Sequence, residues 1–263
     1  MSFNHEKPTV KSKKDLEVPC ELMYPDDAET FVIITHGFGS SKESATAQMM
    51  LHDLPQAGFG AIAYDLPAHG TAEARGTDLT IENCITSLRA VEKYIAERFS
   101  FPEICYFSSS FGAYLTLLSF TKNRYSIHEH RGSRAFLRSA AVNMPDLFTK
   151  DPDPEVLRIL GEQGAYTIMD AGPAPVRITQ QFFDELKEND LFKAAAEIPF
   201  DDLDIQMVHG EKDMVIAPEA AKRFAEENGI PLVMFDGEDH TLSTHPVTPA
   251  RVSELAIKCF KKK

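Results

Sequence analysis

The sequence predicts an α/β fold in which a mostly parallel sheet is flanked by helices. Short apolar runs alternate along the chain with stretches of helical periodicity. Because these runs lack polar alternation, they are typical of strands that are buried on both faces of a parallel sheet. The expected strands cover residues 31–35, 60–64, 103–107, 140–143, 205–208 and 232–235.

The stretches between these runs predict the covering helices. Apolar residues recur every three or four positions after Thr80, which is a favourable helix N-cap. The segment 40–43 has the spacing of a capping box and predicts a helix that ends near residue 56. Pro218 and Pro249 mark the starts of two further helices, and Gly229 ends the first of them.

One long segment interrupts this alternation. Between about Met144 and Pro199 no buried-strand run appears, and the helical patterns are broken by Pro and Gly. The segment carries apolar bulk, including Phe182 and Phe183, so we expect it to pack as an insertion and not to act as a linker. The expected division is a core made of residues 1–144 and 200–263, with an insertion at 145–199.

Composition and charge exclude several classes of function. The chain has 263 residues and a net charge of −13, which argues against a nucleic-acid surface and against docking on anionic lipid. No stretch approaches the 18 or so apolar residues that span a membrane, and the N-terminus lacks the apolar core of a secretory signal. The four cysteines have no metal-type spacing, so we expect buried thiols in a reducing cytoplasm and no metal or disulfide site.

A turn rich in small residues follows the expected strand at 103–107. The sequence SSSFG leads from that strand into an apolar helix, which is the setting of a nucleophile elbow. Ser110 takes the central position, with Ser108 and Gly112 as the small residues on either side. Ser108 stands where the pattern usually has glycine. Read alone, the three serines could also be simple helix caps.

Two further segments end expected strands with an acid and a histidine. Asp213 follows the strand at 205–208, and His240 follows the strand at 232–235. The order Ser110, Asp213, His240 is the one expected of a nucleophile elbow fold. A serine hydroxyl needs a base to take its proton, and the base needs an acid that fixes its tautomer. Asp213 alone could be a residue near a helix N-cap, and His240 alone could be an ordinary histidine.

A glycine-rich turn, HGFGSS, follows the expected strand at 31–35. Such a turn can present backbone N–H groups to the oxyanion of a tetrahedral intermediate. We assign that role to the N–H groups of Phe38 and of Phe111, the residue after the candidate nucleophile. His36 is interpreted as a hydrogen bonder that stabilises the turn, and Asp65 and His69 as loop structure.

Together the stretches HGFGSSKES, YDLPAHG, FSSSFGAY, VHGEKDMVIAPEAA and FDGEDHTLS resemble the serine α/β-hydrolase superfamily. This resemblance extends from about residue 30 to the end of the chain. Within the superfamily, the sequence is similar to small bacterial carboxylesterases of the feruloyl or cinnamoyl esterase type. It implies an α/β-hydrolase fold with a small helical cap insertion, at 145–199, that covers an acyl or aromatic pocket. It also implies hydrolysis of a carboxylic ester through an acyl-enzyme at Ser110, without metal or cofactor.

Other functions of the same residues stay open. A thioesterase, a monoglyceride lipase or a peptidase of this fold would use the same triad, and a ligand-binding protein could retain a vestigial one. The expected partner is a small-molecule ester, and a homodimer stays open. Phe182 and Phe183 are expected either to line the substrate pocket or to pack the cap onto the sheet.

Overall fold

A largely parallel sheet forms the centre of the molecule. The computed structural model describes residues 3–71, 74, 78–100, 102–122 and 134–261. Within these residues a nine-stranded sheet has the order β1-β3-β5-β4-β6-β7-β10-β11, and β2 pairs with β3 beside it. Neighbouring strands from β5 to β11 are parallel, whereas β1, β2 and β3 form an antiparallel edge.

The strands are β1 (Asn4–Glu6), β2 (Thr9–Lys11), β3 (Glu17–Tyr24), β4 (Thr30–Thr35), β5 (Gly60–Tyr64), β6 (Glu103–Ser109), β7 (Arg134–Arg138), β8 (Ala165–Ile168), β9 (Val176–Thr179), β10 (Asp204–Gly210) and β11 (Leu232–Phe235). The helices are α1 (Ala45–Gln56), α3 (Ile81–Arg98), α4 (Phe111–Lys122), α5 (Met144–Thr149), α6 (Pro154–Gln163), α7 (Gln180–Glu188), α8 (Leu191–Glu197), α9 (Pro218–Glu227) and α10 (Thr248–Phe260).

Both faces of the sheet are buried, which explains the continuous apolar runs of its strands. In β4, Val32 and Ile34 join the hydrophobic cluster under α1 and α10. Their neighbours Phe31 and Ile33 join the cluster that includes residues of α3, α4 and α9 on the opposite face. Successive side chains of a strand point to opposite faces, so a strand covered on both sides must be apolar throughout.

Most of the expected strands are confirmed, but the one predicted at 140–143 is wrong. The strand lies earlier, at β7, and residues 140–143 turn over the end of β6 instead. Ala141 N donates to the carbonyl of Ser110, and Val142 N donates to the carbonyl of Ala140. β7 begins and ends with arginine, so its sequence RAFLR lacks the continuous apolar run that predicted the other strands.

Two further details depart from the sequence prediction. The helix predicted from the capping box begins only at Ala45, because residues 40–43 wrap around the buried Asp65, to which Lys42 donates from both its N–H and its ammonium. The N-cap is Ser44, whose hydroxyl accepts a hydrogen bond from Ala47 N. The segment before β10 also contains the β8–β9 hairpin, whose strands AYTI and VRIT carry the exposed polar residues Thr167 and Arg177 and so lack a continuous apolar run.

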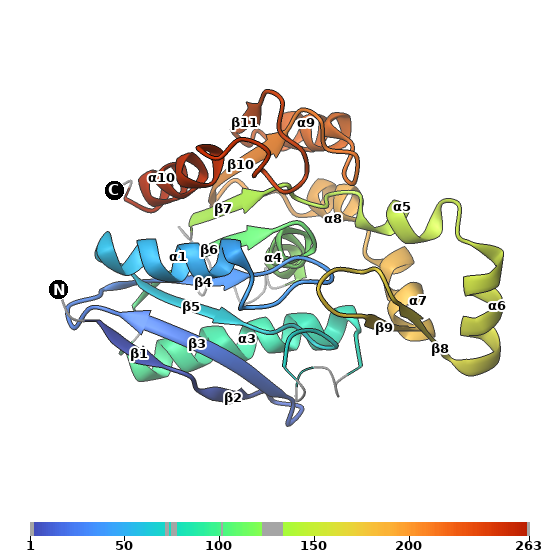
Figure 1. Cartoon of the computed structure of the whole chain (residues 1–263), viewed down its shortest axis with the longest axis horizontal. Coiled ribbons are helices and arrows are strands. Elements are labelled where there is room, and N and C mark those ends of the chain that lie inside the picture. Colours follow the sequence, from blue (N-terminus) through green and yellow to red (C-terminus); the bar gives the residue numbers. More distant parts are fainter. Residues whose placement is uncertain (1–2, 72–73, 75–77, 101, 123–133, 262–263) are drawn as a thin grey trace.

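The segment between β7 and β10 holds α5, α6, β8, β9, α7 and α8. Figure 1 shows α5, α6, the hairpin and α7 gathered at the right, the end to which the arrows of β4, β5 and β6 point. The hairpin is tied to the core by a bridge between Leu79 and Ile178 and by an ion pair between Arg177 and Asp78. None of the helices in the described residues is both long enough and apolar enough to cross a bilayer.

Candidate active site

Ser110 lies in the sharp turn between β6 and α4. Its φ of 51° is in the left-handed region, a strained conformation for a residue other than glycine. Gly112 allows this turn, because a Cβ there would lie 2.5 Å from the carbonyl oxygen of His36. Ser108 is accommodated in place of the usual glycine, since its hydroxyl bonds to that of Thr116, 2.8 Å away in the buried space under α4.

The three residues predicted from separate strand ends lie in hydrogen-bond contact. His240 Nε2 is 2.9 Å from Ser110 Oγ, and His240 Nδ1 is 2.7 Å from Asp213 Oδ2. A carboxylate at Nδ1 holds the proton on that nitrogen and leaves Nε2 free to accept the serine proton. The Ser110 hydroxyl therefore faces a base and does not cap α4.

The Asp213 carboxylate is saturated with donors. Oδ1 accepts from the N–H groups of Val215 and Ile216, each at 2.8 Å. Oδ2 accepts a hydrogen bond from His240 Nδ1, and Nε2 of the fully buried His209 lies 3.0 Å from the same oxygen. Burial raises the pKa of Asp213, but the hydrogen bonds from His209, His240 and the Ile216 N–H outweigh it and hold this pKa well below its usual range. Asp213 is therefore ionised at neutral pH.

The loop that carries His240 is fixed by a second buried acid, Glu238. Its carboxylate accepts from the N–H groups of Thr244 and His245, from the His245 ring and from the Thr248 hydroxyl, at 2.7–3.0 Å. Burial raises the pKa of Glu238, but these hydrogen bonds lower it to about 2. Ser139 also donates to the carbonyl of His240. Glu238 thus holds the loop, and the carboxylate that contacts the His240 ring is that of Asp213.

The predicted oxyanion donors border the nucleophile. In the part of the chain that the structure describes, the N–H groups of Phe38 and Phe111 donate no hydrogen bond. Both rings belong to one aromatic contact, with centroids 5.9 Å apart. Gly39, one residue beyond Phe38, has a φ of 71° and lies so close to the β8–β9 loop that a Cβ would overlap the carbonyl of Ala171. The inserted segment therefore rests on the loop that carries one of the two donors.

His36 has the structural role that the sequence predicted. Its Nε2 accepts from Leu66 N at 3.0 Å, so its Nδ1 carries the proton and donates to the carbonyl of Gly37 at 2.8 Å. The buried ion pair of Lys42 with Asp65, at 2.8 Å, ties the loop after β4 to the loop after β5. These bonds hold the backbone of the turn in place while leaving the Phe38 N–H unused.

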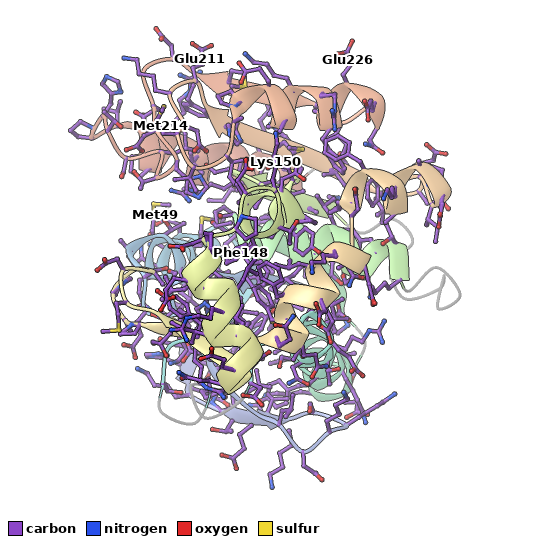
Figure 2. The ribbon with its side chains drawn as sticks, turned by 90° about the vertical axis from the view of Figure 1, so that its right-hand side faces the viewer. Met49, Phe148, Lys150, Glu211, Met214 and Glu226 are labelled. Carbon is purple, nitrogen blue, oxygen red and sulfur yellow. The ribbon has the colours of Figure 1, made fainter. Side chains whose placement is uncertain are left out.

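A cavity of about 490 Å³ opens beside Ser110 and His240. Its walls come from α1 and α10, from the loop after β4, from the loop that carries His240 and from the ends of β6 and β7. The lining residues include Met49, Thr46, Ser109 and Arg138. None of its lining residues belongs to the segment between β7 and β10. In Figure 2 Met49 lies to the left of Phe148, a residue of α5 in that segment.

Phe182 packs the inserted segment onto the core and does not line this cavity. Its ring is fully buried and lies 5.7–6.4 Å, between centroids, from the rings of Phe38, Phe111 and Phe148. Phe183 is buried as well and packs against Lys187 on its own helix. Of the two roles expected for these residues, the geometry favours packing.

Three features of the site were missed by reasoning from the sequence. His209 is the residue just before Gly210 in the motif HGEKD and lies against Asp213, a contact that only the turn after β10 creates. The Lys42–Asp65 pair joins residues from two loops. Arg138 was hidden in a strand that was predicted in the wrong place.

Among the described residues no three His, Cys, Asp or Glu side chains are grouped so that they could hold a metal ion.

Comparisons with known proteins agree with this architecture. A family model described as "Alpha/beta hydrolase family" matches residues 32–255. A hydrolase from Agrobacterium vitis S4, called putative in its description, is similar in structure, with a TM-score of 0.78 at 19% identity over 99% of this chain and 100% of that one. Est1E from Butyrivibrio proteoclasticus, solved with ferulic acid bound, has a TM-score of 0.75 at 18% identity over 97% and 100%.

The esterase domain of a Rhodothermus marinus protein gives a TM-score of 0.68 at 19% identity, over 98% of this chain and 97% of the other. At these identities the similarity to solved structures shows the fold. A search of curated proteins found no match. Because the family model spans most of the chain, and the sheet order and the elbow agree with it, this chain belongs to the alpha/beta hydrolase family.

Proposed function

We propose that this hydrolase is a serine carboxylesterase that acts on a small acyl or aromatic acyl ester. The observation that carries the proposal is the continuous contact from Ser110 through His240 to the buried Asp213, at 2.9 and 2.7 Å. The two unused N–H groups beside Ser110 add the second requirement of acyl transfer, a place for the oxyanion.

The reaction proceeds in two displacements. Ser110 Oγ attacks the ester carbonyl carbon while His240 Nε2 takes the hydroxyl proton, and the resulting oxyanion is held by the N–H groups of Phe38 and Phe111. The C–O bond to the alcohol then breaks, and the imidazolium gives its proton to the leaving alkoxide. A water molecule, deprotonated by His240, attacks the acyl-enzyme, and the acid leaves as Ser110 regains its proton. Asp213 stabilises the imidazolium in both halves.

The segment 145–199 acts, in this proposal, as a cap that supports the oxyanion loop. The support for this role is the contact of Gly39 with Ala171 and the packing of Phe182 on Phe38 and Phe111. Aromatic acyl esters are included in the proposed substrate class because Est1E, which binds ferulic acid, is among the structural neighbours.

The test is a panel of matched esters, thioesters and anilides of acetate, butyrate and cinnamate, assayed with the purified chain. We expect the esters to be the best substrates and Ser110→Ala to abolish turnover of all of them. Ser109→Ala, one residue away and also at the cavity, is the matched control and should keep activity. Preference for thioesters or anilides would reassign the reaction, and full activity in Ser110→Ala would refute the mechanism.

A further inference from the structure

A buried arginine lies beside the candidate nucleophile, on the α1 and α10 side of the sheet. Arg138 ends β7, directly opposite Ser109 in the pairing of β6 with β7, and its carbonyl accepts from Ser110 N at 2.9 Å. Only 9% of its surface is exposed, and its side chain lines the cavity that opens at Ser110 and His240. In a chain of net charge −13, a cationic residue thus lines the same cavity as Ser110 and His240.

The protein supplies few hydrogen-bond acceptors for the guanidinium group of Arg138. Its one hydrogen bond within the described part of the chain runs from Nη2 to the carbonyl of Thr241. A guanidinium has five N–H donors, so most of them have no protein acceptor. Three carboxylates lie close enough to raise the pKa of Arg138, but in the described residues none forms an ion pair with it. They are Asp239, Asp213 and Glu238, which bind Thr241, His240 and His245 instead.

In the described part of the chain, no guanidinium nitrogen of Arg138 is among the buried side-chain atoms that lack a hydrogen-bond partner, so its unused N–H donors reach the open space of the cavity. They are therefore available to an anion that enters the cavity. Burial lowers the pKa of Arg138 to about 10, against the opposing pull of the nearby carboxylates, and the side chain stays charged at neutral pH. The rest of the cavity wall combines apolar side chains, such as Met49 and Leu242, with the hydroxyl groups of Ser44, Thr46 and Ser243, and no acidic residue is among its lining residues. Such a wall suits a carboxylate, whose two oxygens match the fork of a guanidinium.

We propose that Arg138 binds a free carboxylate of the substrate, so that the preferred substrates are esters that carry a second, ionised carboxyl group. This inference rests on the proposed esterase function and narrows it to a substrate class. Arg138 would act as a specificity residue that anchors the substrate in the cavity, while Ser110 and His240 carry out the chemistry.

The test compares charged and neutral esters of equal length. For the acyl side, the pair is the mono-4-nitrophenyl ester of glutaric acid and 4-nitrophenyl pentanoate; for the alcohol side, it is 4-acetoxybutanoate and butyl acetate. In Arg138→Met we expect kcat/KM for the charged ester of at least one pair to fall about 10- to 100-fold more than for its neutral partner, the loss typical of a charge-assisted contact. Arg138→Lys keeps the charge without the fork and should show a smaller selective loss.

Equal losses on charged and neutral esters in both variants would overturn the inference, because they would mean that Arg138 only holds the Thr241 loop. The lysine variant decides the question if the methionine variant does not fold. Binding of glutarate to Ser110→Ala, measured by calorimetry, separates this inference from the proposed function. If the protein hydrolyses no ester, glutarate binding that Arg138→Met abolishes would still support the anion site, and binding that ignores Arg138 would refute it.

Discussion

Replacing Phe182 with alanine should damage stability and oxyanion binding together. The ring is fully buried and contacts the rings of Phe38, Phe111 and Phe148 at centroid distances of 6.4, 6.0 and 5.7 Å. A buried Phe→Ala change costs about 3–5 kcal/mol through lost transfer energy and the cavity left behind. Urea unfolding should show that loss, and Tm should fall by about 6–20 °C.

The same change removes a packing partner from Phe38 and Phe111, the two residues whose N–H groups we propose as oxyanion donors. Loss of one such donor costs about 10²–10³-fold in kcat, so their displacement should lower kcat by about 10-fold or more in protein that remains folded. Phe183→Ala is the matched control, because Phe183 is 3% exposed but makes no ring contact with Phe38 or Phe111 in the described residues. It should lose similar stability and keep kcat. A rise in KM for long-chain esters alone, without loss of stability, would show that Phe182 lines a substrate pocket.

Three further substitutions test the parts that hold the site. Asp213→Asn should lower kcat by about 10³–10⁴-fold, because the histidine loses the acceptor that fixes its tautomer, whereas Asp239→Asn should remain active. Lys42→Met should destabilise the protein by about 3–5 kcal/mol, because the buried Asp65 loses its ammonium partner, and Lys42→Met with Asp65→Asn should recover part of this loss in urea unfolding. Glu238 has a folded-state pKa below its unfolded value, so its stabilisation is present above about pH 5 and disappears as the pH falls toward 2. The difference in unfolding free energy between wild type and Glu238→Gln should shrink over that range, and a constant difference would contradict the assignment.

The sheet was predictable from the sequence because its strands are buried on both faces. β5 and β11 lie where the apolar runs GAIAY and LVMF predicted them. The position of β7 could not be predicted in this way, because its two arginines interrupt the apolar pattern. Arg134 reaches out to Glu103 and to the carbonyl of Phe260, and Arg138 turns into a cavity. Such contacts depend on neighbouring strands, which a single segment does not reveal.

The candidate site also contains residues that the sequence predicts and residues that it does not. Ser110, Asp213 and His240 each follow a strand, so the rule that parallel strands end at one edge brings them together. His209 and Glu238 could not be predicted, because their positions arise from how the loops after β10 and β11 fold back on the site. The position of the cavity beside α1 and α10 also depends on packing. The sequence left open whether Phe182 and Phe183 line a pocket or pack the cap, and both are buried and absent from the cavity wall.

The central claim is that Ser110 is the nucleophile, and covalent labelling tests it most directly. The chain would be treated with a fluorophosphonate, digested and sequenced by tandem mass spectrometry, with fragment ions that separate Ser108, Ser109 and Ser110. We predict a single adduct on Ser110 Oγ, formed by wild type and absent from both Ser110→Ala and the base variant His240→Ala. An adduct on Ser109 or on a serine outside the elbow, or folded wild-type protein that forms none, would contradict the account.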